Sequence, residues 1–216
     1  MGFVEYTADS MPALLEAMLE HTVLVLQGLG LAILIALPLA VLTYRHRSRG
    51  AVLAVAGVFL TIPSYALFGL LITPLGLGTA PSVIALTLYA FLPVIRNTVV
   101  GLREVDPAVV ESARGMGLSR TQTLLQVELP LALPVIVTGL RVATQMILGI
   151  AAIAAAVNGP GLGNLILQGL TSAGTPFAVY LTLQGIIGIV VLAILFDLFF
   201  AALGRLTTTR GMMIRA

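Results

Sequence analysis

Five apolar runs, each about as long as a membrane-crossing helix, constrain this chain more than any other feature. A helix needs about 20 apolar residues to cross the hydrocarbon of a bilayer. The runs cover residues 19–43, 51–73, 81–100, 134–157 and 178–203. Apolar residues make up 59% of the 216 residues and charged residues only 9%, which leaves little sequence for a water-soluble domain. The sequence therefore predicts an all-α polytopic membrane protein with five transmembrane helices, and one transmembrane domain over residues 1–216.

Two residue types are missing, and each absence excludes a class of site. The chain has no cysteine, so disulfides and thiolate metal sites are excluded, and we expect no metal site. All 11 basic residues are arginine. A P-loop nucleotide site needs a lysine that reaches the β- and γ-phosphates. If ATP drives this protein, another chain binds the ATP and its Mg²⁺, and this chain carries no cofactor and no catalytic residue.

The arginines predict which side of the membrane each segment faces, because basic residues are retained on the cytoplasmic side. They follow the first run, surround the segment between the third and fourth runs, and occupy the C-terminal tail: Arg45, Arg47, Arg49; Arg96, Arg103, Arg114, Arg120, Arg141; Arg205, Arg210, Arg215. The N-terminus, the turn near Gly76 and residues 158–176 contain no Arg or Lys. We therefore expect the N-terminus outside and the C-terminus in the cytoplasm.

The polar segment between the third and fourth runs, about residues 101–133, begins with the signals of a short helix. Asp106 before Pro107 is typical of an N-cap followed by proline at the first helical position. Gly117 is placed to end this helix in a left-handed conformation. The helix would carry a weakly apolar stripe at i, i+4 and i+7: Val109, Ala113 and Met116.

A second short helix is predicted directly after Gly117. Ser119 and Gln122 form the S-x-x-Q pattern of a capping box. We expect this helix to run to Glu128 and to stop before Pro130 and Pro134. Two short helices joined at a glycine, at the cytoplasmic surface, are suited to docking a partner.

The same segment resembles the EAA motif of ABC importer permeases. That motif is E-A-A, then Gly after three residues, then an aliphatic residue, any residue, Leu and Pro after nine more. The matching residues here are Glu111, Ser112, Ala113, Gly117, Val127, Leu129 and Pro130. The spacing is kept throughout, and Ser112 is the one departure. Capping patterns alone are common in solvated loops, so the resemblance depends on the complete spacing.

In the family this loop contains the coupling helix that seats in a groove of the cytoplasmic ATPase. The resemblance implies that role for Asp106, Pro107, Glu111, Ser112, Ala113, Arg114, Gly117, Leu129 and Pro130. For Glu111 two interpretations stay open. It contacts the ATPase, or it braces the loop against Arg114 or Arg120, which we favour slightly.

Longer stretches are similar to the permeases of glycine betaine, carnitine and choline importers. These stretches are 61–71, 88–117, 127–141 and 158–170. The resemblance implies a type I, MetI-like permease fold in a bacterial or archaeal plasma membrane. It also implies two ATPase subunits, a second copy of the permease or a homologous permease, and an external substrate-binding protein, with no nucleic acid. Because this sequence ends at Ala216, we expect the binding protein to be a separate chain.

Compatible solutes of the betaine class, namely glycine betaine, carnitine, choline and proline betaine, are the substrates this resemblance implies. Quaternary ammonium groups bind to aromatic cages, with Trp the best face. The chain has no Trp and its five Tyr are scattered, so we expect specificity to lie in the external binding protein. An importer of another small solute, such as ergothioneine or an amino acid, remains an alternative. An ion-coupled transporter would need intramembrane carboxylates or inverted repeats, of which the sequence offers Asp197 alone; a membrane scaffold would need no gate.

Two segments are candidates for the translocation path. Pro63 breaks the second run and frees a carbonyl, as helix breaks along pathways do, although kinks also arise for packing. Its neighbours Thr61, Ser64 and Tyr65, and the more distant Tyr89, are the path residues we expect there. The second candidate is a glycine-rich outer gate, with a tight turn as the alternative interpretation. Its residues are Asn158, Gly159, Gly161 and Gly163.

Ionisable residues within the runs are the remaining candidates, because a charge in a bilayer is costly and often functional. His21 and Asp197 lie near run ends, where solvation at the membrane interface is the expected explanation. Arg141 lies deeper, and an internal partner is possible, with Glu128 and Asp197 as the candidates. The small-residue run 149–159 permits close helix contact.

Overall fold

The computed structural model describes residues 2–207, and every regular element within them is helical. Of the predicted cytoplasmic tail, Arg210 and Arg215 lie outside the described residues. In chain order the elements are α1 (Phe3–Asp9), α2 (Met11–Thr43), α3 (Arg49–Thr61), α4 (Ser64–Leu75), α5 (Thr79–Arg103), α6 (Pro107–Gly115), α7 (Arg120–Thr123), the π-helix η1 (Leu124–Glu128), α8 (Leu129–Ala151), the 3₁₀-helix η2 (Ala152–Val157), α9 (Gly163–Thr171) and α10 (Ala178–Thr207).

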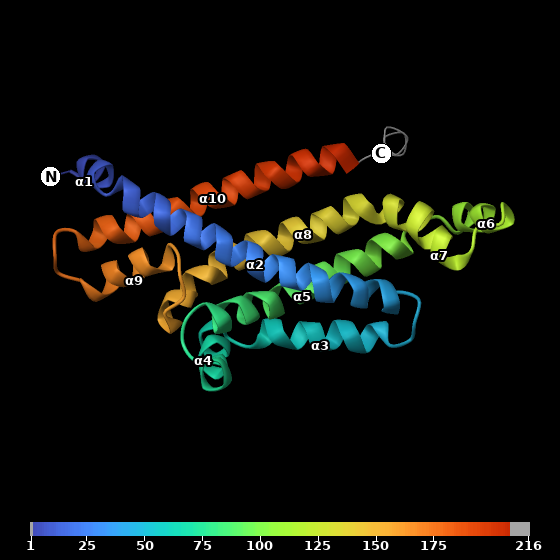
Figure 1. The fold of residues 1–216 in the computed structure, drawn as a ribbon, viewed down its shortest axis with the longest axis horizontal. Coiled ribbons are helices and arrows are strands. Elements are labelled where there is room, and N and C mark those ends of the chain that lie inside the picture. The colour runs from blue at the N-terminus through green and yellow to red at the C-terminus, as the bar shows by residue number, and fades with distance from the viewer. Residues whose placement is uncertain (1, 208–216) are drawn as a thin grey trace.

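Within the described residues, four helices have the length and composition of a membrane span. They are α2, α5, the continuous helix Arg120–Val157 and α10. The bent pair α3 and α4 supplies a fifth span if the two are counted together. The long helices run along the molecule, with α6 and α7 at one end and α1, α9 and the chain start at the other (Figure 1). The all-α, five-span prediction is confirmed.

The second predicted span is not one helix over residues 51–73. Helix α3 ends at Thr61, α4 begins at Ser64, and the two are bent by 99°. The cause is Pro63, because the residue before a proline is pushed out of the helical region. Ile62 accordingly has φ −74° and ψ 126°, which is extended backbone.

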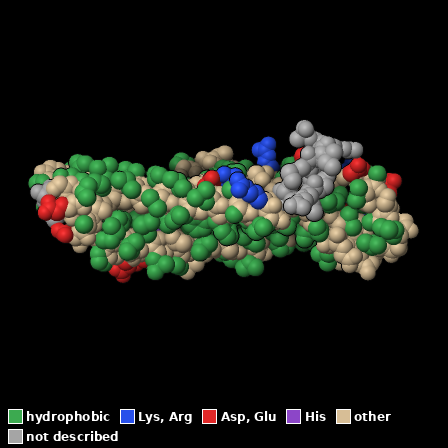
Figure 2. Space-filling model, turned by 90° about the horizontal axis from the view of Figure 1, so that it is seen from above, with side chains coloured by type: hydrophobic (Ala, Val, Ile, Leu, Met, Phe, Trp, Pro, Cys, Tyr) green, Lys and Arg blue, Asp and Glu red, His purple; other side chains and the backbone are tan. Residues whose placement is uncertain are grey.

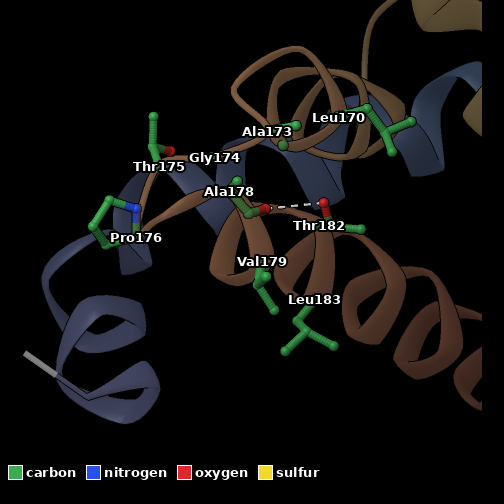
Figure 3. A pocket seen from close by; sticks show the side chains of 10 residues that line it. Leu170, Ala173, Gly174, Thr175, Pro176, Ala178, Val179, Thr182 and Leu183 are labelled. Atoms are coloured by element: carbon green, nitrogen blue, oxygen red, sulfur yellow. Dashed lines mark hydrogen bonds between the residues drawn. The ribbon is translucent and has the colours of Figure 1, made fainter.

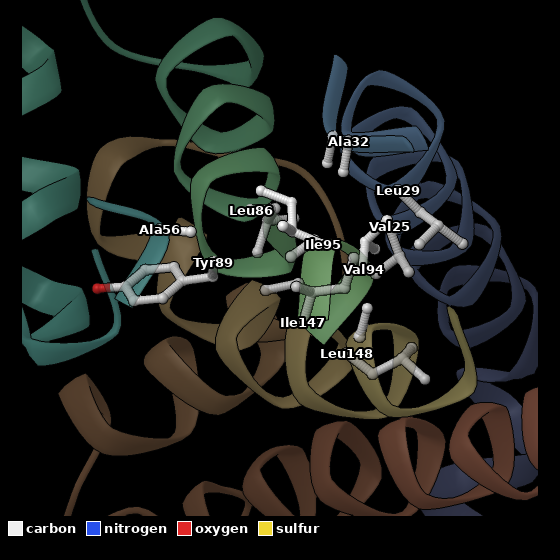
Figure 4. Close-up of a cluster of buried hydrophobic side chains, with 14 of the residues drawn as sticks. Val25, Leu29, Ala32, Ala56, Leu86, Tyr89, Val94, Ile95, Ile147 and Leu148 are labelled. Carbon is white, nitrogen blue, oxygen red and sulfur yellow. The ribbon is translucent and has the colours of Figure 1, made fainter. Parts of the chain in front are cut away.

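Helix α5 occupies the centre of the bundle, where it packs against both α2 and α8. Buried aliphatic side chains from the three helices meet there, among them Val25 and Leu29 of α2, Leu86, Val94 and Ile95 of α5, and Ile147 and Leu148 of α8 (Figure 4). In a bilayer the lipid tails are as apolar as these side chains, so close packing rather than removal from water holds the helices together.

Glycines let these helices approach closely. A Cβ placed on Gly28 of α2 would lie 2.8 Å from the Cβ of Leu86, and one placed on Gly139 of α8 would lie 2.5 Å from the Cβ of Asn97. Real Cβ atoms do not come this close, so each contact requires a residue without a side chain. Small residues at such crossings are typical of membrane helices.

Replacing Gly139 with valine should destabilise the α5–α8 contact by about 1–3 kcal/mol, the usual cost of overpacking a tight core. The matched control is Gly149→Val in the same helix, because a Cβ at Gly149 meets nothing within 4 Å. Thermal unfolding in detergent should show a lower Tm for the first variant only. Equal Tm values for the two variants would contradict the packing derived for Gly139.

Candidate functional site

The loop between α5 and α8 projects from one end of the bundle and carries the short helices α6 and α7 (Figure 1). Helix α6 begins as predicted, because the Asp106 carboxylate accepts a hydrogen bond of 2.9 Å from the Ala108 N–H. Its end is also as predicted. Gly117 has φ +91°, the Gly117 N–H bonds the Arg114 carbonyl, and the Leu118 N–H bonds the Ala113 carbonyl. This pair of bonds is a Schellman motif, which fixes the direction of the chain leaving the helix.

The predicted capping box at the start of α7 is present. The Ser119 N–H donates to Gln122 Oε1 at 2.8 Å, and the Gln122 N–H donates to Ser119 Oγ at 3.3 Å. The turn between α6 and α7 is therefore held by local hydrogen bonds on both sides of Gly117. A loop fixed in this way is a stiff structural element although it lies at the surface.

The predicted stop of the second helix before Pro130 and Pro134 is wrong. From Arg120 the chain continues through η1 into α8 without a break, so the loop proper ends at Ser119 rather than near residue 133. Proline in a helix removes one N–H and its ring collides with the preceding turn. Here the wide π turn Leu124–Glu128 ends two residues before Pro130 and changes the hydrogen-bonding pattern of the turn that leads into the proline.

The apolar stripe of α6 differs from the predicted one. Val110 and Ala113 are buried, whereas Val109 is 42% exposed and Met116 is 75% exposed. Val109, Ser112 and Met116, spaced at i, i+3 and i+7, therefore share an outward face. Of the predicted stripe only Ala113 faces the protein. The helix itself was predicted correctly, but the face that packs against the protein was not. A nine-residue helix has too few turns to define its apolar stripe unambiguously.

Glu111 is exposed, and among the described residues no ion pair joins it to Arg114 or Arg120. The bracing interpretation that we favoured for Glu111 is wrong. The buried carboxylate near this loop belongs instead to Glu128, which is only 2% exposed and lies in η1. Glu128 accepts a hydrogen bond of 2.6 Å from the Tyr44 hydroxyl and one of 2.8 Å from Arg45.

This network of Tyr44, Arg45 and Glu128 ties the end of α2 to the base of the loop. The sequence reasoning missed it, and considered Glu128 only as a partner for Arg141. An isolated glutamate beside an apolar run, with a Tyr-Arg pair at the end of another run, was the available signal. Burial, together with the hydrogen bond to Glu128 and the charge of Glu128, raises the pKa of Tyr44 to about 12.

Around this network the arginines gather at one end of the molecule. A recess of about 400 Å³ beside Glu128 is lined by four of them and by Glu111: Arg45, Arg49, Arg103 and Arg114. Four of the eleven arginines therefore lie together at the α6 end. Positive charge exceeds negative charge in this recess.

Arg141 finds its partner in Asp197 rather than in Glu128. Its Nε and Nη2 atoms donate to the two carboxylate oxygens at 2.6 and 2.7 Å, joining α8 to α10. The prediction for His21 is wrong. His21 is fully buried in α2, with Nε2 3.1 Å from the Leu148 carbonyl oxygen, rather than solvated at an interface.

The first group of predicted path residues lies at the break between α3 and α4. The Tyr89 hydroxyl, reaching across from α5, donates to the carbonyl of Ile62 at 2.7 Å. Thr61 donates to the Val58 carbonyl, and Tyr65 stays 71% exposed. Tyr89 and the Pro63 break are thus brought together, with Tyr89 buried and holding the break.

The second group, Asn158 to Gly163, lies towards the other end of the molecule, between η2 and α9 (Figure 1). Asn158 adopts the left-handed conformation, with φ 58°. Gly161 has φ +110°, lies against the backbone of His21, and its N–H donates to Glu20 at 3.1 Å. Gly159 and Gly163 are also packed closely. In Figure 1 this segment lies well apart from the α6 loop along the long axis of the molecule, although α1 and the turn between α9 and α10 extend beyond it.

A further recess, of about 670 Å³, lies at the turn between α9 and α10 and contains none of the predicted path residues (Figure 3). Its lining is apolar apart from Thr175 and Thr182, and Thr182 donates to the Ala178 carbonyl. It has no charged side chain with which to recognise a polar solute.

The fold and the loop together define a polytopic membrane protein that presents a stiff helical element at one end. Residues 28–209 match the family described as binding-protein-dependent transport system inner membrane component, and the chain belongs to that family. It is therefore a multi-pass inner-membrane permease subunit of an ABC importer, a transport subunit rather than an enzyme. Such a subunit works with an ATPase and a substrate-binding protein.

Two curated relatives are similar over most of their length. The osmoprotectant import permease protein OsmW of Salmonella typhimurium is 39% identical over 98% of this chain and 99% of its own. The choline transport system permease protein OpuBB of Bacillus subtilis is 35% identical over 89% of this chain and 88% of its own. The MetNI methionine ABC transporter, solved in inward-facing conformations, superposes with a TM-score of 0.81 over 93% of this chain and 99% of that chain, at 23% identity. That likeness confirms the MetI-like fold.

The Tyr44–Glu128 contact predicts a loss of stability at high pH. A hydroxyl whose pKa rises from 10.0 to about 12 on folding favours the neutral form in the folded protein. Its stabilising contribution is therefore complete below pH 10 and is lost as the pH rises towards 12. Thermal unfolding of wild type and Tyr44→Phe in detergent should differ at pH 8 to 9 and converge as the pH approaches 12.

Tyrosinate absorbance provides the direct check. Subtracting the Tyr44→Phe titration from that of wild type should leave one group titrating near 12. In Glu128→Gln, which keeps a hydrogen-bond acceptor but removes the charge, that group should titrate at lower pH. A difference titration centred at 10.0 in wild type would contradict the buried contact.

Proposed function

We propose that this permease imports osmoprotectants of the quaternary amine class: glycine betaine, carnitine, choline and proline betaine. The support is the pair of full-length relatives named for osmoprotectant and choline transport. The lack of Trp argues against an aromatic cage in this subunit, so we assign the tight binding of the solute to the external binding protein.

The observation that supports coupling to an ATPase is the exposed face of α6. Val109 and Met116 expose apolar surface at the tip of a stiff loop, and Glu111 and Arg114 add exposed charges beside it. An exposed apolar face on a short helix is a surface for seating in a groove of another protein. We therefore propose that α6 is the coupling helix. Asp106, Pro107, Ser112, Ala113, Gly117, Leu129 and Pro130 shape or anchor it.

The complete transporter that we propose has two permease copies, or this chain with a homologous permease, and two ATPase subunits. Each α6 then meets one ATPase, which binds ATP and Mg²⁺. The solute is delivered by a separate binding protein on the opposite face of the membrane. Because the arginines gather at the α6 end, we place that end in the cytoplasm and the N-terminus outside.

For the path we propose two elements at different depths. The broken helix at Thr61, Pro63, Ser64 and Tyr65, held by Tyr89, contributes backbone polar groups where α3 turns away from the bundle. The segment Asn158, Gly159, Gly161 and Gly163 forms the outer gate. Its hydrogen bond from Gly161 to Glu20 is a contact that opening of the gate would break.

Uptake of labelled solutes tests the substrate proposal. The permease, its ATPase and its binding protein should be expressed together in cells that lack betaine uptake, and labelled glycine betaine, carnitine and choline supplied under osmotic stress. We expect ATP-dependent accumulation of at least one of these solutes, and none when the ATPase is inactive. Accumulation of ergothioneine or an amino acid, without any betaine-class uptake, would refute the proposal.

Replacing Gly117 with valine should uncouple ATP hydrolysis from uptake. A left-handed conformation costs an L-residue about 1–2 kcal/mol, and a Cβ at Gly117 meets nothing within 4 Å, so the substitution acts through the backbone alone. Gly115→Val is the matched control, since Gly115 also has open space but is helical. Uptake per ATP hydrolysed should fall in the first variant and be kept in the second. Wild-type uptake and ATPase stimulation in Gly117→Val would remove Gly117 from the coupling element.

A further inference from the structure

The ion pair between Arg141 and Asp197 joins two helices that are long and apolar enough to span the membrane, and the pair is half-exposed. Each side chain is 42% exposed in the isolated chain, although two hydrogen bonds join them. Charged side chains at bilayer depth are costly and almost always face the bundle interior or a water-filled cavity. The face of α8 and α10 that carries this pair is therefore covered by water or protein rather than by lipid.

The surroundings of the pair are apolar. Neighbouring residues of α10, including Ile194 and Leu198, are exposed aliphatic side chains. The view onto α10 in Figure 2 shows a mostly hydrophobic surface with few charged side chains along the middle of the molecule. An ion pair on such a surface offers a charged or polar solute a group to bind.

Two recesses lie on either side of the pair along the α8–α10 groove. One, of about 290 Å³, is lined by Gln145, Ala193 and Asp197 among others. The other, of about 470 Å³, is lined by Arg141 and, nearer the end of α10, by Gly204 and Arg205. The ion pair thus separates the two recesses: Asp197 lines the smaller one and Arg141 lines the larger one.

Opening the ion pair would not by itself separate the two helices. The Gln145 side chain donates to the Ala193 carbonyl at 2.9 Å, one turn away from the pair along both helices. Helices α8 and α10 also pack directly against each other. The guanidinium and the carboxylate are therefore free to exchange partners while the groove keeps its form.

We propose that Arg141 and Asp197 form a transient binding site for a zwitterionic solute within the membrane. The inference rests on the proposed function, since the solutes considered there include molecules with a quaternary ammonium and a carboxylate. The Arg141 guanidinium takes the solute carboxylate, for which its planar fork is suited. The Asp197 carboxylate takes the quaternary ammonium, which has no N–H and therefore pairs with the carboxylate by charge, without a hydrogen bond. Arg141 and Asp197 each exchange their partner in the ion pair for the opposite charge of the solute, so no unpaired charge is left in the membrane.

This site distinguishes two solutes of the proposed class. Glycine betaine carries both charges and uses both residues, whereas choline has no carboxylate and uses Asp197 only. Proteoliposomes containing the complete transporter, with ATPase and binding protein, should be given both labelled solutes in one assay. The ratio of betaine to choline uptake does not depend on how much active protein each preparation holds.

In Arg141→Gln the betaine-to-choline ratio should fall about tenfold, the effect of losing a hydrogen bond to a charged group. In Asp197→Asn the uptake of both solutes should fall, with the ratio nearly unchanged. Arg45→Gln is the matched control, because Arg45 forms a second ion pair within residues 2–207, away from this groove. It should lower both solutes equally if it lowers either. Should Arg141→Gln fail to assemble, Arg141→Lys, which keeps the charge without the fork, decides the question by the same ratio.

An unchanged ratio in the Arg141 variants, with both solutes reduced together, would overturn the site and leave a pair that only joins α8 to α10 or the two permease copies. That outcome leaves the proposed function intact, because wild type still accumulates the solutes. If wild type accumulates none of glycine betaine, carnitine and choline, the proposed function is refuted instead, and this site with it.

Discussion

The interior of a bilayer offers no hydrogen-bond partners to a polypeptide backbone, and the architecture of this protein follows from that constraint. Long helices satisfy their own backbone, so the chain needs additional partners only where a helix is interrupted. At the α3–α4 break, the Tyr89 hydroxyl binds the Ile62 carbonyl. In the glycine-rich segment, Glu20 binds the Gly161 N–H and the Asn164 side chain binds the Gly159 carbonyl. Each side chain that bonds the backbone at a helix break comes from a neighbouring helix or from the turn that follows the break.

The same constraint explains why polar side chains in the bundle are few and paired. Glu128 is buried but accepts hydrogen bonds from Tyr44 and Arg45, and Arg141 is bidentate with Asp197. The arginines of the two pairs are similarly exposed, at 46% for Arg45 and 42% for Arg141, so the pairs differ in the exposure of the carboxylate. The 2% exposed Glu128 can only hold the end of α2 to the start of α8. The Arg141–Asp197 pair is open to whatever occupies the groove, because 42% of each side chain is exposed.

Sequence reasoning predicted the features that depend on local chemistry. The spans follow from hydropathy, and the Asp106 cap, the Gly117 turn and the Ser119 box follow from residues whose preferred conformations are strong. What it missed depends on contacts between distant segments. Glu128 and Tyr44 are 84 positions apart, and nothing in the sequence distinguishes Arg45 from Arg141 as the partner of Glu128. The burial of His21 likewise depends on Leu148 and Gly161, which only the folded chain brings to it.

The continuation of the helix past Pro130 was missed because a proline is expected to stop a helix. This continuation changes how the two ends of the molecule are connected. A stop there would have made the loop an appendage joined to the membrane by flexible chain. Instead one helix runs from Arg120 to Val157, carrying the capping box at its start, Arg141 along its length and Asn158 just beyond its end. A hydrogen-bonded helix is stiff, so we expect Arg120–Val157 to behave as a rod that carries Arg141 along α10, except where its geometry departs from α-helical. The π turn at Leu124–Glu128 and the 3₁₀ turns at Ala152–Val157 are the departures from α-helical geometry within this rod. They lie near the two ends of the rod, where Glu128 contacts Tyr44 and where η2 leads into the glycine-rich segment. We therefore expect changes in helix geometry at these two turns, while the centre of the rod, with Arg141, moves as one body.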